Sequence, residues 1–237
     1  MKNSTILATA ILAGVVAQPA YAQDADPDFF NGVYVGGSFG LDGLDDEAGE
    51  GIVFDTDGDG EYGDTVRTTT GANAFGPGFC NGIANGPRAA DGCSDDKSRF
   101  GYGVRIGFDQ CIGDGPIVAG LLVEGAMSDS EEYSNGFSTT PASYTFKREL
   151  DKSVALRGRL GVSPGSGRGL IYVTGGLAYA DIDHDFITTN GANSFTMTDD
   201  DDWQLGGQIG AGGELYLFDN VSLGLEYLYS RYDDNDA

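Results

Sequence analysis

The sequence lacks long apolar runs and is poor in basic residues. After Ala17 no stretch approaches the about 18 consecutive apolar residues from which a membrane-spanning helix is built. The earlier run from Ile6 to Ala17 is too short to span a bilayer as a helix. Only 13 Lys and Arg stand against 37 Asp and Glu, which gives a formal net charge of −24. We therefore expect neither a helical anchor nor a nucleic-acid partner.

Cysteine is also scarce, with Cys80, Cys93 and Cys111 as the three examples. An exported chain can form disulfides, and the first two cysteines lie in one hydrophilic segment. We therefore predict a Cys80–Cys93 disulfide, which leaves Cys111 beside a tight turn as a thiol.

The single histidine limits the catalytic chemistry. His184 is expected at the start of a loop, at the opposite end of the fold from Ser163, so a Ser-His pair is not expected. The G-x-S-x-G match at 161–165 lies in a strand-to-strand turn, whereas a nucleophile elbow needs a strand-to-helix turn. A lipid-modifying outer-membrane enzyme is the main enzymatic alternative. One class of these, the lipid A deacylases, has His and Ser two apart on one strand, but Phe186 follows His184 at that spacing. We predict no catalytic residue, no enzymatic activity and no certain cofactor.

The N-terminus has the pattern of a secretory signal peptide. Lys2 precedes the apolar run, and Ala20-Tyr21-Ala22 forms an A-x-A cleavage site. Residues 1–22 are therefore expected to be cleaved, so that the mature protein comprises residues 23–237.

Glycine and aromatic residues are abundant, with 39 Gly, 13 Phe and 12 Tyr, a composition that favours strands punctuated by glycine. Alternation is clearest from Trp203 to Arg231, where two segments meet at Asp219-Asn220 and apolar side chains share one face of each. Each arm exceeds the roughly 9–11 residues that a tilted strand needs to cross a bilayer. Five further alternating segments precede this hairpin: 31–41, 100–109, 117–128, 152–162 and 169–182.

The connections between these segments alternate between long and short, as in bacterial barrels with long extracellular loops and tight periplasmic turns. The sequence therefore predicts an all-β fold, an antiparallel up-and-down transmembrane β-barrel of the eight-stranded type. A long acidic extracellular loop is expected at about 42–97. Only seven strands are visible, whereas single-chain bacterial barrels use an even number. The interpretation is that the last strand, after Arg231, is missing and that the chain is a C-terminally truncated fragment.

Charges of both signs fall on the faces opposite to the lipid-facing ones. They are Arg105, Glu124, Arg157, Arg159, Glu214 and Glu226. An eight-stranded barrel is just wide enough inside for side chains to fill it, so these six residues are predicted to form a charge network that plugs the lumen. Packing is favoured over gating or conduction, which leaves a small porin as the alternative.

The long loop contains the D-x-D-x-D-G run of a calcium-binding loop at 55–60. Position twelve of the pattern is Val66, where a bidentate Glu is expected, so a merely solvated acidic loop is the alternative. A second acidic run, 199–202, is interpreted as a solvated rim that divalent cations would bridge to lipid head groups. The candidate Ca2+ ligands are Asp55, Asp57, Asp59, Glu61 and Asp64.

Four stretches together resemble a known family: FFNGVYVGGSFG at 29–40, the loop at 55–60, YVTGGLAYA at 172–180 and VSLGLEYLYSRYD at 221–233. They are similar to alphaproteobacterial outer-membrane immunogenic proteins, opacity-like surface antigens related to the OmpA transmembrane domain. The resemblance implies an eight-stranded outer-membrane barrel with roles in envelope integrity and as a surface antigen. The implied partners are outer-membrane lipids, lipopolysaccharide or an equivalent glycolipid, and the assembly machinery.

Members of this family end in a strand that closes on an aromatic residue, which Ala237 does not supply. An adhesin with an unidentified extracellular partner is a further alternative. A soluble lipocalin-like barrel is a more remote one, because its interior would have to bury the six charges.

Overall fold

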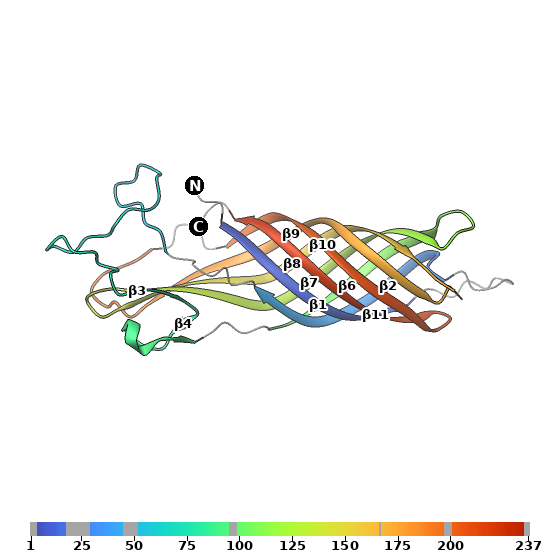
Figure 1. The fold of residues 1–237 in the computed structure, drawn as a ribbon, viewed down its shortest axis with the longest axis horizontal. Helices are drawn as coiled ribbons and strands as arrows, with labels where there is room; N and C mark the ends of the chain where they lie inside the picture. Colours follow the sequence, from blue (N-terminus) through green and yellow to red (C-terminus); the bar gives the residue numbers. More distant parts are fainter. Residues whose placement is uncertain are drawn as a thin grey trace.

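The computed structural model of the chain describes residues 4–17, 29–44, 52–94, 99–165, 167–196 and 201–234. The chain forms one long barrel whose strands run obliquely around a common axis (Figure 1). All contacts between neighbouring strands of the ring are antiparallel. The eight strands of the ring are β1 (Ser4–Ala17), β2 (Gly32–Leu44), β6 (Arg99–Cys111), β7 (Ile117–Phe137), β8 (Ser143–Val162), β9 (Gly169–Thr188), β10 (Asp201–Phe218) and β11 (Val221–Asp234).

Each strand pairs with its neighbour in the order just given, and β11 pairs with β1 to close the ring. The predicted fold class, an antiparallel up-and-down β-barrel of the eight-stranded type, is confirmed. Short turns join β6 to β7 (residues 112–116), β8 to β9 (163–168) and β10 to β11 (219–220) at one end, which we call the short-turn end. The opposite end, which we call the long-loop end, carries the long connections 45–98 between β2 and β6 and 189–200 between β9 and β10, together with the short turn 138–142 between β7 and β8 (Figure 1). β1 ends and β2 begins at the short-turn end.

The eighth strand is β1, and the prediction that the chain shows only seven strands was wrong. β1 pairs with β11 over its whole length, from Ser4 opposite Asp234 to Ala17 opposite Val221. Its other edge pairs with β2 from Ala8 to Ala17. The sequence prediction assigned this segment to a signal peptide because an apolar run lies between Lys2 and an A-x-A motif, but a run that contains Ile, Val and Thr is also suited to a strand. Cleavage of residues 1–22 stays a prediction; it would remove β1 from the ring, so the two assignments of this segment exclude each other. The motif at 20–22 lies outside the described residues.

Side chains alternate between the lumen and the outer surface. Apolar side chains face outward and charged side chains face inward, which is the reverse of a soluble protein. On β6 Phe100 is 74% exposed and points outward, whereas Arg105 is only 8% exposed and points inward. The same alternation leaves large apolar side chains exposed on β2 and β7 to β11. An apolar exterior around a charged interior is typical of a barrel that is surrounded by membrane lipid.

Three strands, β7, β8 and β9, have 20 or 21 residues and extend well beyond the others at the long-loop end (Figure 1). The sequence predicted a polar loop where β7 continues past Ser128 and β8 begins, and this prediction was wrong. A register shift at Met127/Ser130 interrupts the pairing of β7 with β8, and one at Leu150/Lys152 interrupts the pairing of β8 with β9. A bulge breaks the alternation with period two, so the pattern no longer indicates a strand beyond it.

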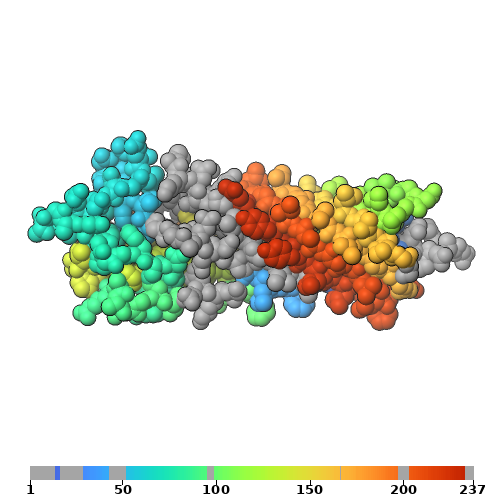
Figure 2. Space-filling model, in the orientation of Figure 1, coloured from blue at the N-terminus to red at the C-terminus, as the bar shows by residue number. Residues whose placement is uncertain are grey.

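Residues 52–94 belong to the predicted long acidic loop and fold against this extension, where Figure 2 shows them covering the long-loop end. The segment contains β3 (Gly78–Asn81), β4 (Ile83–Ala84), the 3-10 helix η1 (Ala89–Asp91) and β5 (Cys93–Ser94). β3 pairs with the end of β7, from Gly78 opposite Phe137 to Asn81 opposite Ser134. A disulfide joins Cys80 to Cys93. The ring of Phe75 lies 4.7 Å from that of Phe54 and 5.1 Å from that of Tyr144 on β8, so aromatic packing holds the loop on the barrel.

Apolar side chains close the lumen at the short-turn end. Phe29 and Phe30, which precede β2, are buried with their ring centroids each 4.9 Å from that of Tyr216. The guanidinium group of Arg168 lies 4.7 Å from the centroid of Phe29, a cation–π contact. Cys111, which is outside the disulfide, is also part of this cluster, with its Sγ 3.8 Å from the carbonyl oxygen of Phe29.

Candidate functional site in the barrel lumen

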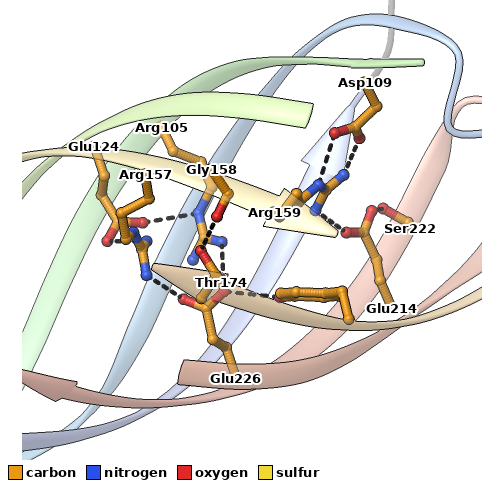
Figure 3. A network of polar contacts seen from close by, with 11 residues as sticks. Arg105, Asp109, Glu124, Arg157, Gly158, Arg159, Thr174, Glu214, Ser222 and Glu226 are labelled. Atoms are coloured by element: carbon orange, nitrogen blue, oxygen red, sulfur yellow. Dashed lines mark hydrogen bonds and ion pairs between the residues drawn. The ribbon is translucent and has the colours of Figure 1, made fainter. Parts of the chain in front are cut away.

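Two layers of ion pairs cross the lumen (Figure 3). The layer nearer the short-turn end is centred on Arg159 of β8. Its Nε donates to Oδ1 of Asp109 at 2.7 Å, its Nη2 donates to the other oxygen of that carboxylate, and its Nη1 donates to Oε2 of Glu214 at 3.0 Å. The hydroxyl of Ser222 donates to the remaining oxygen of Glu214 at 2.6 Å. β6, β8, β10 and β11 are therefore linked across the barrel by one arginine.

The rings of two tyrosines flank the same arginine. The guanidinium carbon of Arg159 lies 4.7 Å from the ring centroid of Tyr34 and 5.3 Å from that of Tyr172. A cation held between aromatic faces in a water-poor interior gains electrostatic stabilisation from both rings.

The second layer contains two arginines and two glutamates. Arg157 donates from Nη2 to Glu124 and from Nη1 to Glu226, with both distances 2.8 Å. Arg105 lies 2.8 Å from Glu124 through its Nε and 3.7 Å from Glu226 through its Nη1. The hydroxyl of Tyr172 donates to Oε2 of Glu226 at 2.8 Å. The four charges form a closed and neutral ring.

The strand period explains why these residues meet. Arg157 and Arg159 are two apart on β8, so both point to the lumen, one above the other. All seven charged side chains of the two layers belong to residues that are at most 8% exposed. Buried charges persist at such positions only when they are paired and hydrogen-bonded, and removal of one partner leaves the other uncompensated. Chemically, the arrangement links strands on different sides of the barrel through paired charges.

The structure brings together all six residues that the sequence predicted for the lumen, and it adds Asp109. This aspartate lies four residues after Arg105 on β6 and shares its inward face. The sequence argument matched three arginines with three glutamates and therefore omitted the fourth carboxylate. Its place on the inward face of the strand was the signal that could have included it.

The candidate calcium ligands separate into two groups. Asp55, Asp57 and Asp64 each bring a carboxylate oxygen within 4.8 Å of one another. The other two candidates are not in this group: Asp59 accepts a hydrogen bond from the N–H of Glu61 at 2.8 Å, and both of these residues are exposed. Among the described residues these three aspartates are the ones whose geometry suits a hard divalent cation.

Backbone N–H groups stabilise two of the three carboxylates in their charged form. The N–H of Gly60, and then that of Gly58, lower the pKa of Asp55, whose oxygens accept from them at 2.9 and 2.7 Å. The N–H and hydroxyl of Thr56 likewise lower the pKa of Asp64. Both side chains are therefore ionised and oriented at neutral pH.

The residues considered for catalysis lie far apart. Ser163 is in the turn between β8 and β9, where its hydroxyl donates to the carbonyl oxygen of Gly167 at 3.0 Å. His184 lies within β9 opposite Arg148 of β8, in the extension at the long-loop end, and not at the start of a loop as the sequence predicted. Within the part of the chain that the structure describes, no helix has the length and apolarity needed to cross a membrane.

An apolar exterior, a ring of eight antiparallel strands and buried ion pairs in the lumen define the class of protein: a transmembrane β-barrel. A family model described as outer membrane protein beta-barrel domain matches residues 8–237, and the chain belongs to this family. Membership implies a location in the bacterial outer membrane. No curated protein and no solved structure matches the chain in the corresponding comparisons.

Proposed function

We propose that this chain is a non-catalytic surface protein of the outer membrane that supports the integrity of the envelope. The observation that carries the proposal is the pair of ion-pair layers, which join β6, β7, β8, β9, β10 and β11 through the lumen. The long-loop end would face the exterior and the short-turn end the periplasm, as in bacterial barrels generally. The four sequence motifs support a place within the group of immunogenic, opacity-like surface antigens.

Conductance in planar bilayers tests whether the lumen is closed. We expect the protein to hold the membrane current near its baseline, and the double variant Arg157→Ser, Arg159→Ser to raise it, because both layers lose their central cations. Leu156→Ser, Leu160→Ser is the matched control on the outer face of the same strand. Heat-dependent migration of each variant in gel electrophoresis reports folding. A large, steady conductance of the unmodified protein would instead favour the small porin.

Loss of the gene tests the envelope role. Cells without the protein should become more sensitive to detergent and to chelators, and the unmodified gene should restore resistance. If the deletion strain keeps its normal resistance but no longer binds to surfaces, this result would favour the adhesin.

Membrane lipids, including lipopolysaccharide or an equivalent glycolipid, are the partners that we propose for the outer surface. Trp203 and Tyr179 stack at 5.0 Å between centroids on neighbouring strands, toward the long-loop end of the apolar band. Phe218 is 66% exposed at the opposite end. Aromatic side chains at both ends of an apolar band are typical of the two membrane interfaces. We also propose that Asp55, Asp57 and Asp64 bind Ca2+ in the extracellular loop.

A further inference from the structure

A cavity of about 50 Å³ lies inside the barrel, on the long-loop side of the ion-pair layers. Glu124 belongs both to its wall and to the neutral four-charge ring described above. The other polar groups of the wall come from five strands: Ser38 and Asp42 of β2, Ser128 of β7, Ser153 of β8, Gln208 of β10 and Tyr232 of β11. The cavity therefore has its own polar residues, which the ion-pair layers do not use, apart from Glu124.

Two buried oxygens in this wall, Oδ1 of Asp42 and Oε1 of Gln208, have no hydrogen-bond donor. The amide nitrogen of Gln208 is already engaged, because it donates to the hydroxyl of Ser230 at 3.1 Å and lies 3.5 Å from that of Tyr232. Its carbonyl oxygen is the end of the amide left for a ligand. Buried acceptors without a donor are uncommon in folded proteins and call for an occupant with positive character.

The charges around the cavity also favour an occupant with positive character. The ring of Arg105, Arg157, Glu124 and Glu226 is neutral, so Asp42 adds one negative charge beside it. In the described part of the chain no ion pair involves Asp42. An unpaired carboxylate in a water-poor lumen is unfavourable unless a proton or a cation neutralises it.

The backbone of β6 makes room for this carboxylate. A Cβ atom built on Gly101 would collide with Oδ2 of Asp42, so the carboxylate lies across the strand at a position where only glycine leaves space. Any larger residue at 101 would force the carboxylate away from its present position. Glycine at 101 thus positions Asp42 at the cavity.

We propose that this cavity binds one monovalent inorganic cation, Na+ or K+. The ligands are Asp42, the carbonyl oxygen of Gln208 and the surrounding hydroxyl groups. Oxygen donors suit hard cations, and a single positive charge balances the carboxylate of Asp42. The binding is independent of the proposed role in the envelope, because it requires only the folded barrel.

Thermal unfolding of the purified protein in detergent tests the proposal. At equal ionic strength, we expect a higher melting temperature in NaCl or KCl than in N-methyl-D-glucamine chloride, whose cation is too large for the cavity. Asp42→Asn should lose this difference, and Gly101→Ala should weaken it with the charge unchanged. Asp114→Asn, an exposed aspartate in the turn between β6 and β7, should retain it. A difference that persists in Asp42→Asn would overturn the proposal.

Crystals of the unmodified protein grown with Tl+ give an independent test that needs no variant. We expect an anomalous peak between Asp42 and Gln208, reduced by competing K+. Ordered water at that position without anomalous signal would show that the cavity holds solvent and would overturn the cation site.

Discussion

Arg157 is fully buried and joins two glutamates that come from different strands. Replacement by Met removes the charge but retains much of the length, and leaves Glu124 and Glu226 with Arg105 alone. We expect Arg157→Met to lower the free energy of unfolding by about 3–5 kcal/mol, measured by urea unfolding in detergent micelles. Leu156→Met, at the adjacent lipid-facing position, should change it by less than about 0.5 kcal/mol. Equal stability of both variants would show that the ion pairs contribute no net stabilisation.

The aspartate-rich loop at 55–64, which we propose to bind Ca2+, offers a comparison between two neighbouring aspartates. Asp57 belongs to the three-carboxylate group, whereas the carboxylate of Asp59 accepts from the N–H of Glu61. We expect Ca2+ to raise the melting temperature of the unmodified protein and of Asp59→Ala, but not of Asp57→Ala. Differential scanning calorimetry with and without a chelator measures this. An equal loss in both variants would favour a diffuse acidic loop over a site.

The same loop should respond to acid in a defined direction. The pKa values of Asp55 and Asp64 are lowered in the folded loop, so their contribution to stability is fully present above the ordinary pKa of about 3.9 and is lost as the pH falls through the lowered values. We expect protection of the Gly58 and Gly60 amides from hydrogen exchange to be unchanged down to about pH 5, allowing for the intrinsic rate, and to disappear below about pH 4. Loss of protection between neutral pH and pH 5 would contradict this.

A strict period of two predicts from the sequence which way a side chain of a strand points. It placed Arg157 and Arg159 in the lumen, and the structure pairs them with Glu124, Glu214 and Glu226. Partners across the barrel could not be assigned, because they depend on the stagger between strands and not on the pattern within one strand.

At the scale of elements, the segment before β2 acts as a hydrophobic closure of the short-turn end. Phe30 is 0% exposed, and it has a φ of 60°, which is unusual for a residue other than glycine. We expect Phe30→Ala to destabilise the barrel by about 3–5 kcal/mol, because it leaves a cavity against Tyr216. Phe218→Ala on the outer surface is the control, with a smaller expected effect. Unfolding by urea in micelles compares the two, and a small effect at Phe30 would show that the closure is loosely packed.

Strand boundaries were predictable from the sequence only inside the apolar band. β6 and β11 differ from their predicted limits by a few residues, since lipid on one side and lumen on the other impose the alternation along their length. The outer parts of β7 and β8 have no such constraint, and they are reached through bulges that reset the register. Their pairing partners include β3 of the long loop, which no local pattern indicates.

At the scale of the whole molecule, closure of the ring depends on the N-terminal strand. The alternation in Val221–Arg231 predicted a free edge, whereas the structure pairs that edge with Ser4–Ala17. An apolar, uncharged segment has the composition of a signal peptide and of a lipid-facing strand alike, so its use could not be decided from composition. The intact mass of protein extracted from membranes reports whether residues 1–22 are retained.

Without β1, both β2 and β11 would expose unpaired N–H and C=O groups to the apolar surroundings, where each such group is costly. We therefore expect a chain without residues 1–22 to refold poorly by itself in micelles, measured by heat-dependent migration and protease resistance. A synthetic peptide of residues 4–17 should increase the folded fraction by occupying the vacant position, whereas a peptide of the same composition in scrambled order should not. Because the register between β1 and β11 is continuous over fourteen residues, shortening the peptide from either end should reduce the rescue in steps. Efficient folding of the shortened chain without any peptide would show that β2 and β11 close the barrel in another way.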